Sequence, residues 1–274
     1  MNARVNSGFF GKLPGHGDFI YRDLPTQFME VWDNWLQLFI SSSQEQIGEG
    51  WLDIYLTSPI WRFALSEGVI DESAWMGIVL PSVDRVGRYF PFTIATRLPA
   101  NSNPIADIST QLEWFENCEE IALQALNDEL SLEEIVASVQ RQSLVSDDTY
   151  VRNNQALHHS PLLMRMEFEE QSAQAVLPFM MDTCLRHSFS SYSVWSTKGS
   201  EYVEPCMFVS QAMPAITGIA AMLDGQWEHW NWPEPYRLNV SYEQPAQAGT
   251  TAMDGEQPSY IDPPTPQQFD QNHE

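Results

Sequence analysis

Two continuous apolar runs lie close together in the first half of the chain, at residues 74–80 and 92–98. Both are rich in β-branched and aromatic residues, and runs of this length and composition predict buried β-strands. The connector between them, Pro81–Pro91, is polar and carries three charges: Asp84, Arg85 and Arg88. We expect this connector to be either a binding surface or a brace in which Asp84 pairs with Arg85 or Arg88, and we favour the brace.

The same kind of pattern predicts the other elements of the first half. Apolar residues recur at helical spacing from Pro25 to Ile47, which indicates an amphipathic helix. Residues 51–57 alternate in part and predict a strand, and a short strand followed by a Gly/Pro turn is expected within residues 8–22. Residues 51–98 should therefore form an antiparallel sheet, and the chain should belong to the α+β class with helices flanking that sheet.

The second half is predicted to be helical with one hairpin. Ser131 followed by Glu134 forms a capping-box signature at the start of a helix. The expected helices cover residues 109–126, 131–142, 175–187 and 214–223, and the expected hairpin pairs residues 192–196 with 202–210. We expect an α+β region over residues 1–130 and a helical and hairpin region over 131–232 packed on it. A lobe boundary is expected within residues 145–174, and residues 233–274 should be an acidic, Pro/Gln-rich disordered tail.

The charge of the chain narrows the classes of partner. With 13 basic and 37 acidic residues, the formal net charge is −24. Such a field repels phosphate backbones and anionic lipids, so we expect neither nucleic-acid binding nor insertion into a membrane. No apolar h-region and no long apolar run occur, and three widely spaced cysteines are typical of reduced thiols. We therefore expect a cytoplasmic protein.

Motifs for catalysis, cofactors and metals are not met. The Gly11-Lys12 pair lacks a P-loop context, because Asn6 and Leu13 occupy positions that the motif reserves for glycine and for serine or threonine. The pairs His158-His159 and Cys184/His187 lack the further ligands that a zinc site requires. We expect no metal and no cofactor. One constellation remains compatible with a small-molecule enzyme or a nucleotide sensor, namely Lys12, His16, Asp18, Asp84 and Arg88.

Three segments together resemble the TagF family of type VI secretion accessory proteins: Gly11–Phe19, Ser58–Phe63 and Pro81–Pro91. The resemblance is strongest over about residues 8 to 130. It implies an antiparallel sheet of longin- or profilin-like type. It also implies a non-enzymatic, post-translational repressor of type VI secretion that is associated with the forkhead-associated scaffold protein Fha.

Our principal hypothesis is repression of secretion through protein–protein binding, with Fha as the partner. A partner with a basic surface would be steered by the net charge of −24. The candidate protein-binding residues are Lys12, Asp18, Trp61, Arg62, Asp84, Arg85 and Arg88. The alternatives are the small-molecule enzyme or sensor described above and a structural accessory of the secretion apparatus.

Overall fold

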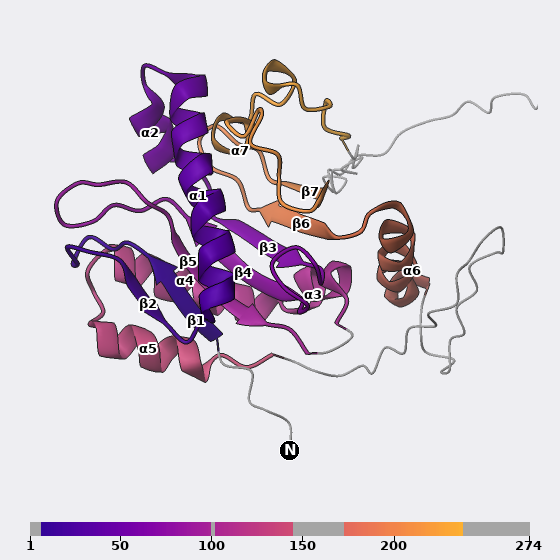
Figure 1. Cartoon of the computed structure of the whole chain (residues 1–274), viewed down its shortest axis with the longest axis horizontal. Helices are drawn as coiled ribbons and strands as arrows, with labels where there is room; N and C mark the ends of the chain where they lie inside the picture. The colour runs from indigo at the N-terminus through magenta and orange to yellow at the C-terminus, as the bar shows by residue number, and fades with distance from the viewer. Residues whose placement is uncertain (1–6, 100–101, 145–172, 238–274) are drawn as a thin grey trace, which may run out of the picture. The chain divides into compact units, whose positions relative to one another are not determined.

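The fold is built on one seven-stranded antiparallel sheet (Figure 1). The computed structural model describes residues 7–99, 102–144 and 173–237. The strands are β1 (Ser7–Gly11), β2 (Ile20–Arg22), β3 (Trp61–Leu65), β4 (Trp75–Leu80), β5 (Phe92–Arg97), β6 (Tyr192–Thr197) and β7 (Cys206–Gln211). Their order across the sheet is β2-β1-β5-β4-β3-β6-β7, and every neighbouring pair is antiparallel. The predicted α+β class with an antiparallel sheet is confirmed.

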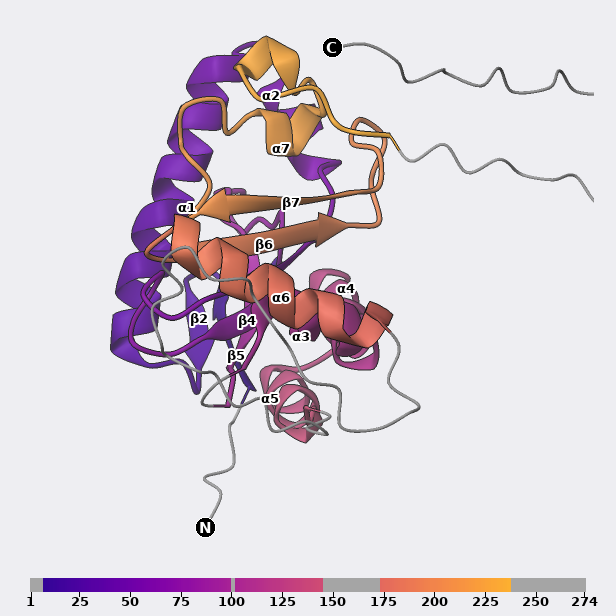
Figure 2. The same cartoon turned by 90° about the vertical axis from the view of Figure 1, so that its right-hand side faces the viewer.

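Helices cover both faces of this sheet (Figures 1 and 2). One face carries α1 (Thr26–Ile47), α2 (Trp51–Leu56) and α7 (Ala221–Asp224), followed by the 3₁₀ helix η1 (Glu228–Trp230). The other carries α3 (Pro104–Thr110), α4 (Leu112–Leu126), α5 (Leu132–Arg141) and α6 (Ala173–Ser188). None of the helices in the described part of the chain is long and apolar enough to cross a membrane.

The two apolar cores explain why the central strands are continuously hydrophobic. Successive side chains of a strand point to opposite faces of the sheet, so a strand covered on both faces buries every residue. In β4, Met76 and Ile78 pack against the α3–α5 side, whereas Trp75 and Val79 pack against α1. The predicted neighbours β4 and β5 pair along their whole length, from Trp75↔Arg97 to Leu80↔Phe92.

Aromatic side chains fill the core beneath α1. Trp32 has no solvent exposure, and its ring lies 4.5 Å from that of Phe63 on β3. Its indole N–H donates a hydrogen bond of 2.9 Å to the hydroxyl of Thr93 on β5. The aromatic stripe of this helix is therefore core packing.

Several sequence-based expectations are confirmed. The helix expected from Pro25 to Ile47 is α1, which begins one residue later, after Pro25 at its N-cap. Ser131 and Glu134 form the expected capping box of α5. The hairpin of β6 and β7 pairs in the register Val194↔Val209, and it joins the sheet through β3 rather than forming a separate layer.

The predicted strand at residues 51–57 is wrong, because Trp51–Leu56 is helical. Trp51 and Tyr55 are four residues apart, and their rings stack with centroids 4.9 Å apart. The Trp51 indole N–H also donates to the Ser43 hydroxyl of α1 at 2.9 Å. The contact within the segment and the hydrogen bond to α1 favour a helix over the strand that the partial alternation predicts.

Three other boundaries also differ from the sequence prediction. The helix expected over 109–126 is two helices, which are separated at Gln111. Of the helix expected over residues 214–223, only residues 221–223 are α-helical, as part of α7. The sequence did not predict the three-residue strand β2. Residues 145–172 and 238–274 lie outside the described residues, so the boundary and the tail expected there remain predictions, as does the longin- or profilin-like type. Contacts delimit one compact unit at Met1–Pro235.

Candidate functional site

The connector Pro81–Pro91 is a closed turn organised by Asp84. The Asp84 carboxylate oxygen Oδ1 accepts hydrogen bonds from the backbone N–H groups of Val86 at 3.0 Å and Arg88 at 2.9 Å. The backbone of Asp84 bonds to Arg88 and Gly87 as well. Gly87 adopts φ of +83°, a left-handed conformation that glycine takes without steric strain. The turn is therefore rigid, and its conformation depends on a buried carboxylate.

Two cations hold the other carboxylate oxygen of Asp84. Oδ2 lies 3.0 Å from the Lys12 ammonium and 2.6 Å from Nε of Arg88. The Asp84 side chain has no exposure and that of Lys12 has 7%, whereas that of Arg88 is 57% exposed. Burial acts to raise the pKa of Asp84, but the hydrogen bonds from Arg88, Lys12 and Val86 together hold that pKa well below its usual range. The Asp84 carboxylate therefore stays ionised at ordinary pH.

The ion triad of Lys12, Asp84 and Arg88 joins the connector to the loop that follows β1. A guanidinium N–H of Arg88 donates to the carbonyl of Gly17 at 2.6 Å, and the backbone N–H of Arg85 donates to the carbonyl of His16 at 2.9 Å. The hydroxyl of Ser82 donates to the carbonyl of Lys12 at 2.6 Å. We call residues 12–19 and 81–91 the loop pair. The predicted brace is present, with Arg88 and Lys12 as the partners of Asp84 rather than Arg85.

Aromatic rings anchor the loop pair to the fold beneath it. Phe19 lies 4.8 Å from the ring of Phe90 and 5.7 Å from that of Phe10, and the Lys12 ammonium lies 4.9 Å from the Phe19 ring. Tyr89 packs edge-on against Trp51 of α2 at 5.6 Å. Tyr55 of α2 both donates to the carbonyl of Ser82 and accepts from its N–H, each at 3.0 Å. Both loops are thus fixed on the side that faces the protein.

The outward side of the loop pair combines apolar and cationic groups. Val86 is 67% exposed at the tip of the turn, and Phe19 and Tyr89 are partly exposed beside it. The guanidinium of Arg85 rests against Gly17, where Nη2 lies 3.3 Å from the position of an added Cβ. We define the Arg85 surface as the exposed side chains of this side, namely Asp18, Phe19, Arg85, Val86, Arg88 and Tyr89.

Two of the candidate residues lie elsewhere. Trp61 and Arg62 belong to β3 and are 3% and 6% exposed. The Trp61 indole donates to the carbonyl of Met222 at 3.0 Å, and Arg62 forms an ion pair with Glu119 of α4. A side chain that contacts a partner directly must reach the surface, so neither residue belongs to the Arg85 surface. Lys12 and Asp84 are buried beneath it and position it.

Sequence reasoning passed over Val86, Tyr89 and Phe19 as contact residues. All three lie within the motif segments that carried the family resemblance, but apolar side chains between core strands predict packing rather than exposure. Asp18 lies at the edge of the surface, where its carboxylate accepts the N–H of Phe19 at 2.8 Å. His16 is half-buried and contributes its backbone carbonyl to the loop pair.

Comparison with known families adds an independent observation. Residues 8–142 match the family described as the TagF N-terminal domain, type VI secretion system-associated. The chain belongs to the TagF family. The matched residues include the whole loop pair, so the braced turn lies inside the TagF domain.

A solved structure supports the same relationship over more of the chain. The crystal structure of PA0076 from Pseudomonas aeruginosa PAO1 is 32% identical, with a TM-score of 0.70. The match covers 86% of this chain and 100% of that one. No curated protein matches the chain.

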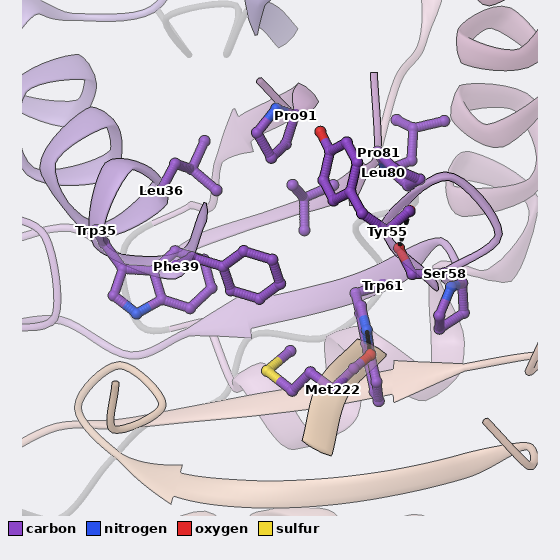
Figure 3. A pocket seen from close by; sticks show the side chains of 12 residues that line it. Trp35, Leu36, Phe39, Tyr55, Ser58, Trp61, Leu80, Pro81, Pro91 and Met222 are labelled. Carbon is purple, nitrogen blue, oxygen red and sulfur yellow. Dashed lines mark hydrogen bonds between the residues drawn. The ribbon is translucent and has the colours of Figure 1, made fainter. Parts of the chain in front are cut away.

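Two hollows in the described part of this TagF protein lie away from the ion triad of Lys12, Asp84 and Arg88. A cavity of about 20 Å³ lies between α1, α2 and the two ends of the connector. Figure 3 shows the side chains that line it, which are mainly apolar, such as Trp35, Phe39 and Met222. A wider hollow of about 450 Å³ lies beside β7, between Val209 and Trp232. Neither is lined by any of the five residues of the enzyme or sensor alternative, namely Lys12, His16, Asp18, Asp84 and Arg88.

Cys184 and His187, which were considered as metal ligands, lie on α6. Among the described residues, no group of three histidine, cysteine, aspartate or glutamate side chains is placed to hold a metal ion. His187 makes a hydrogen bond of 2.7 Å between Nδ1 and the carbonyl of Thr183, one turn earlier in α6. The pair His158-His159 falls outside the described residues.

Proposed function

We propose that this TagF protein is a non-enzymatic, post-translational repressor of type VI secretion that acts in the cytoplasm by binding the Fha scaffold through the Arg85 surface. Membership of the TagF family links the chain to type VI secretion. The observation that carries the finer proposal is the use made of the motif residues. Lys12, Asp84 and Arg88 brace an exposed, partly apolar turn, and none of the three lines either of the two hollows described above.

The state of the ionic residues supports binding over catalysis. A general base requires a pKa near the working pH and access to the proton that it removes. Asp84 meets neither condition, because its pKa is lowered and its side chain is fully buried. Lys12 is committed to Asp84 and is almost as deeply enclosed. A rigid turn that presents Val86 and Tyr89 is better suited to a protein partner, since apolar and aromatic contacts dominate the centre of an interface.

The proposal is tested by secretion and co-purification in the same strain. Deleting the gene should increase type VI secretion, and overproducing the protein should decrease it. The tagged wild-type protein should retain Fha, and Arg85→Glu should lose both Fha and repression. Arg141→Glu is the matched control, because Arg141 is an exposed arginine on α5 whose side chain, among the described residues, bonds only within its own helix, to Ala137 and Ser138.

Other outcomes would contradict the proposal in distinct ways. Loss of secretion on deletion, together with stoichiometric co-purification with assembled particles, would make the protein a structural accessory. Unchanged secretion on deletion together with no retention of Fha would remove the repressor assignment altogether.

A further inference from the structure

Most of the basic side chains that the structure describes are paired with carboxylates of the same chain. In the part of the chain that the structure describes, six basic side chains form ion pairs with carboxylates: Lys12, Arg62, Arg88, Arg97, Arg186 and Lys198. Arg85 differs from all of these. Its side chain makes no hydrogen bond, ion pair or ring contact with any described residue, although the chain carries 37 acidic residues.

The position of Arg85 makes this exception informative. Its backbone is fixed by the N–H bond to the carbonyl of His16, and its guanidinium rests against Gly17. Val86 follows it at 67% exposure, and Tyr89 is supported from below by Trp51. Because the backbone at Arg85 is already fixed, only the side chain loses conformational freedom on binding, which favours affinity. The residue is therefore placed as a contact group beside apolar side chains.

From this placement we infer that the Arg85 surface binds an acidic, carboxylate-bearing segment of the partner protein. The guanidinium of Arg85 would take a carboxylate in the two-point geometry that arginine favours, while Val86 and Tyr89 would bury an apolar side chain beside it. The inference deepens the proposed function and rests on it for the identity of the partner. It also reverses the expectation, drawn from the net charge, of a basic partner.

The chemistry at the loop pair favours carboxylates over phosphates. Phosphate sites combine several cations with free backbone N–H groups, often at the N-terminus of a helix. Here the N–H groups of Arg85, Val86, Gly87 and Arg88 all have acceptors inside the loop pair or are engaged by Asp84. The guanidinium of Arg88 is held by Asp84 and by the carbonyl of Gly17. One free guanidinium remains, which matches one carboxylate.

The net charge then sets a distinctive dependence on salt. The charge of −24 repels an acidic partner over distances longer than the local attraction of Arg85. Moderate salt screens that long-range repulsion first, and the close contact at Arg85 is screened less. Binding should therefore tighten from low to moderate ionic strength. A basic partner would instead bind most tightly at the lowest salt.

The experiment measures the affinity of purified full-length chain for purified full-length Fha at several salt concentrations. We expect Arg85→Glu to weaken binding at least about tenfold at moderate salt, the size of effect that an engaged interface arginine has. Arg85→Lys should be intermediate because it keeps the charge and loses the planar fork, and Arg141→Glu should bind as the wild type does. All variants should melt as the wild type does.

A second arm separates failure of the inference from failure of the proposed function. A fluorescent oligoglutamate containing tyrosine, and an oligolysine of the same design, are titrated against the same proteins. Fha binding with no effect of Arg85→Glu overturns the inference and the use of the Arg85 surface, but it leaves repression through Fha standing. Affinity that only falls with salt overturns the inference alone. If Fha does not bind, Arg85-dependent binding of oligoglutamate keeps the inference, and its absence overturns it.

Discussion

Asp84 and Asp107 are both largely enclosed carboxylates, yet their surroundings act on them in opposite ways. Asp84 receives two cations and two backbone N–H groups, which lower its pKa although burial acts to raise it. Asp107 lies in the first turn of α3, and burial raises its pKa to about 7. A backbone hydrogen bond at Asn103 lowers this pKa by less than burial raises it, and the nearby charge of Asp182 adds to the increase. Its oxygen Oδ2 is buried without a hydrogen-bond partner among the described residues.

The difference shows which carboxylate is part of a rigid support. An anion that is satisfied on both oxygens holds two loops together at any ordinary pH, so the Arg85 surface above it keeps its shape. A buried carboxyl with one oxygen unpaired among the described residues favours its neutral form on folding, and its ionised form destabilises the fold. The first lies in the motif that identifies the family, and the second lies on the opposite side of the sheet, beside α6.

Removing the carboxylate of Asp84 should have the largest effect on the protein. In Asp84→Ala the Lys12 ammonium remains buried without its anion, and both loops lose their common acceptor. We expect a larger decrease in melting temperature than for a substitution at Asp107, Gly17 or Arg85, together with loss of partner binding. Thermal unfolding followed by circular dichroism measures the first effect. A variant that melts like the wild type but fails to bind would make Asp84 a contact residue instead of a brace.

Removing the charge of Asp107 should have the opposite effect and stabilise the protein. Asp107→Asn should raise the free energy of unfolding by about 1–2 kcal/mol at pH 8, because the folded state no longer has to hold a buried, poorly solvated anion. Between about pH 4 and pH 7 the folded carboxyl is protonated while the unfolded one is ionised, so wild-type stability falls as pH rises through this range.

Denaturant unfolding of the wild type and Asp107→Asn at pH 5 and pH 8 measures this difference. At pH 5 the two proteins should be nearly equally stable, because the wild-type carboxyl is then neutral. A stabilisation of equal size at both pH values would attribute the effect to packing and not to charge.

Replacing Asp84 with asparagine, its neutral isostere, should give a pH dependence opposite to that of Asp107→Asn. The folded-state pKa of Asp84 lies below the unfolded value of about 3.9, so its stabilising effect is complete above that pH and is lost as pH falls further. Asp84→Asn should therefore be less stable than the wild type at pH 7, and the gap should narrow only below about pH 4. Urea unfolding between pH 7 and pH 3 follows the gap. If the stability difference between the wild type and Asp84→Asn closed near pH 6, the lowered pKa of Asp84 would be contradicted.

The smallest effect is expected from Gly17→Ala. The added Cβ would lie 3.3 Å from Nη2 of Arg85, so the guanidinium must move by a few tenths of an ångström. Because this is the free end of a flexible side chain, the free energy of unfolding should change by less than about 0.5 kcal/mol. Partner binding should weaken measurably but less than in Arg85→Glu. An undiminished affinity would indicate that the resting position of Arg85 is unimportant.

Local pattern was sufficient for the elements whose packing follows from their own residues. The runs at 74–80 and 92–98 are continuously apolar because helices cover both faces of the sheet, and they form β4 and β5. The aromatic period of α1 and the capping box of α5 are likewise local signals, and the motif segments were enough to place the chain in its family. In each case the signal lies within a few residues, where turn and strand geometry act directly.

Tertiary structure decided the rest, because the deciding contacts join residues far apart in the chain. Trp51 and Tyr55 are helical through their packing and hydrogen bonds with α1 and the connector, which the partial alternation of residues 51–57 does not reveal. Trp61 and Arg62 lie in a motif segment, as the residues of the loop pair do, but contacts with α7 and α4 enclose them. Lys12 and Asp84 are separated by 72 positions. Their pairing, and with it the exposure of Arg85, depends on loop geometry that no local pattern encodes.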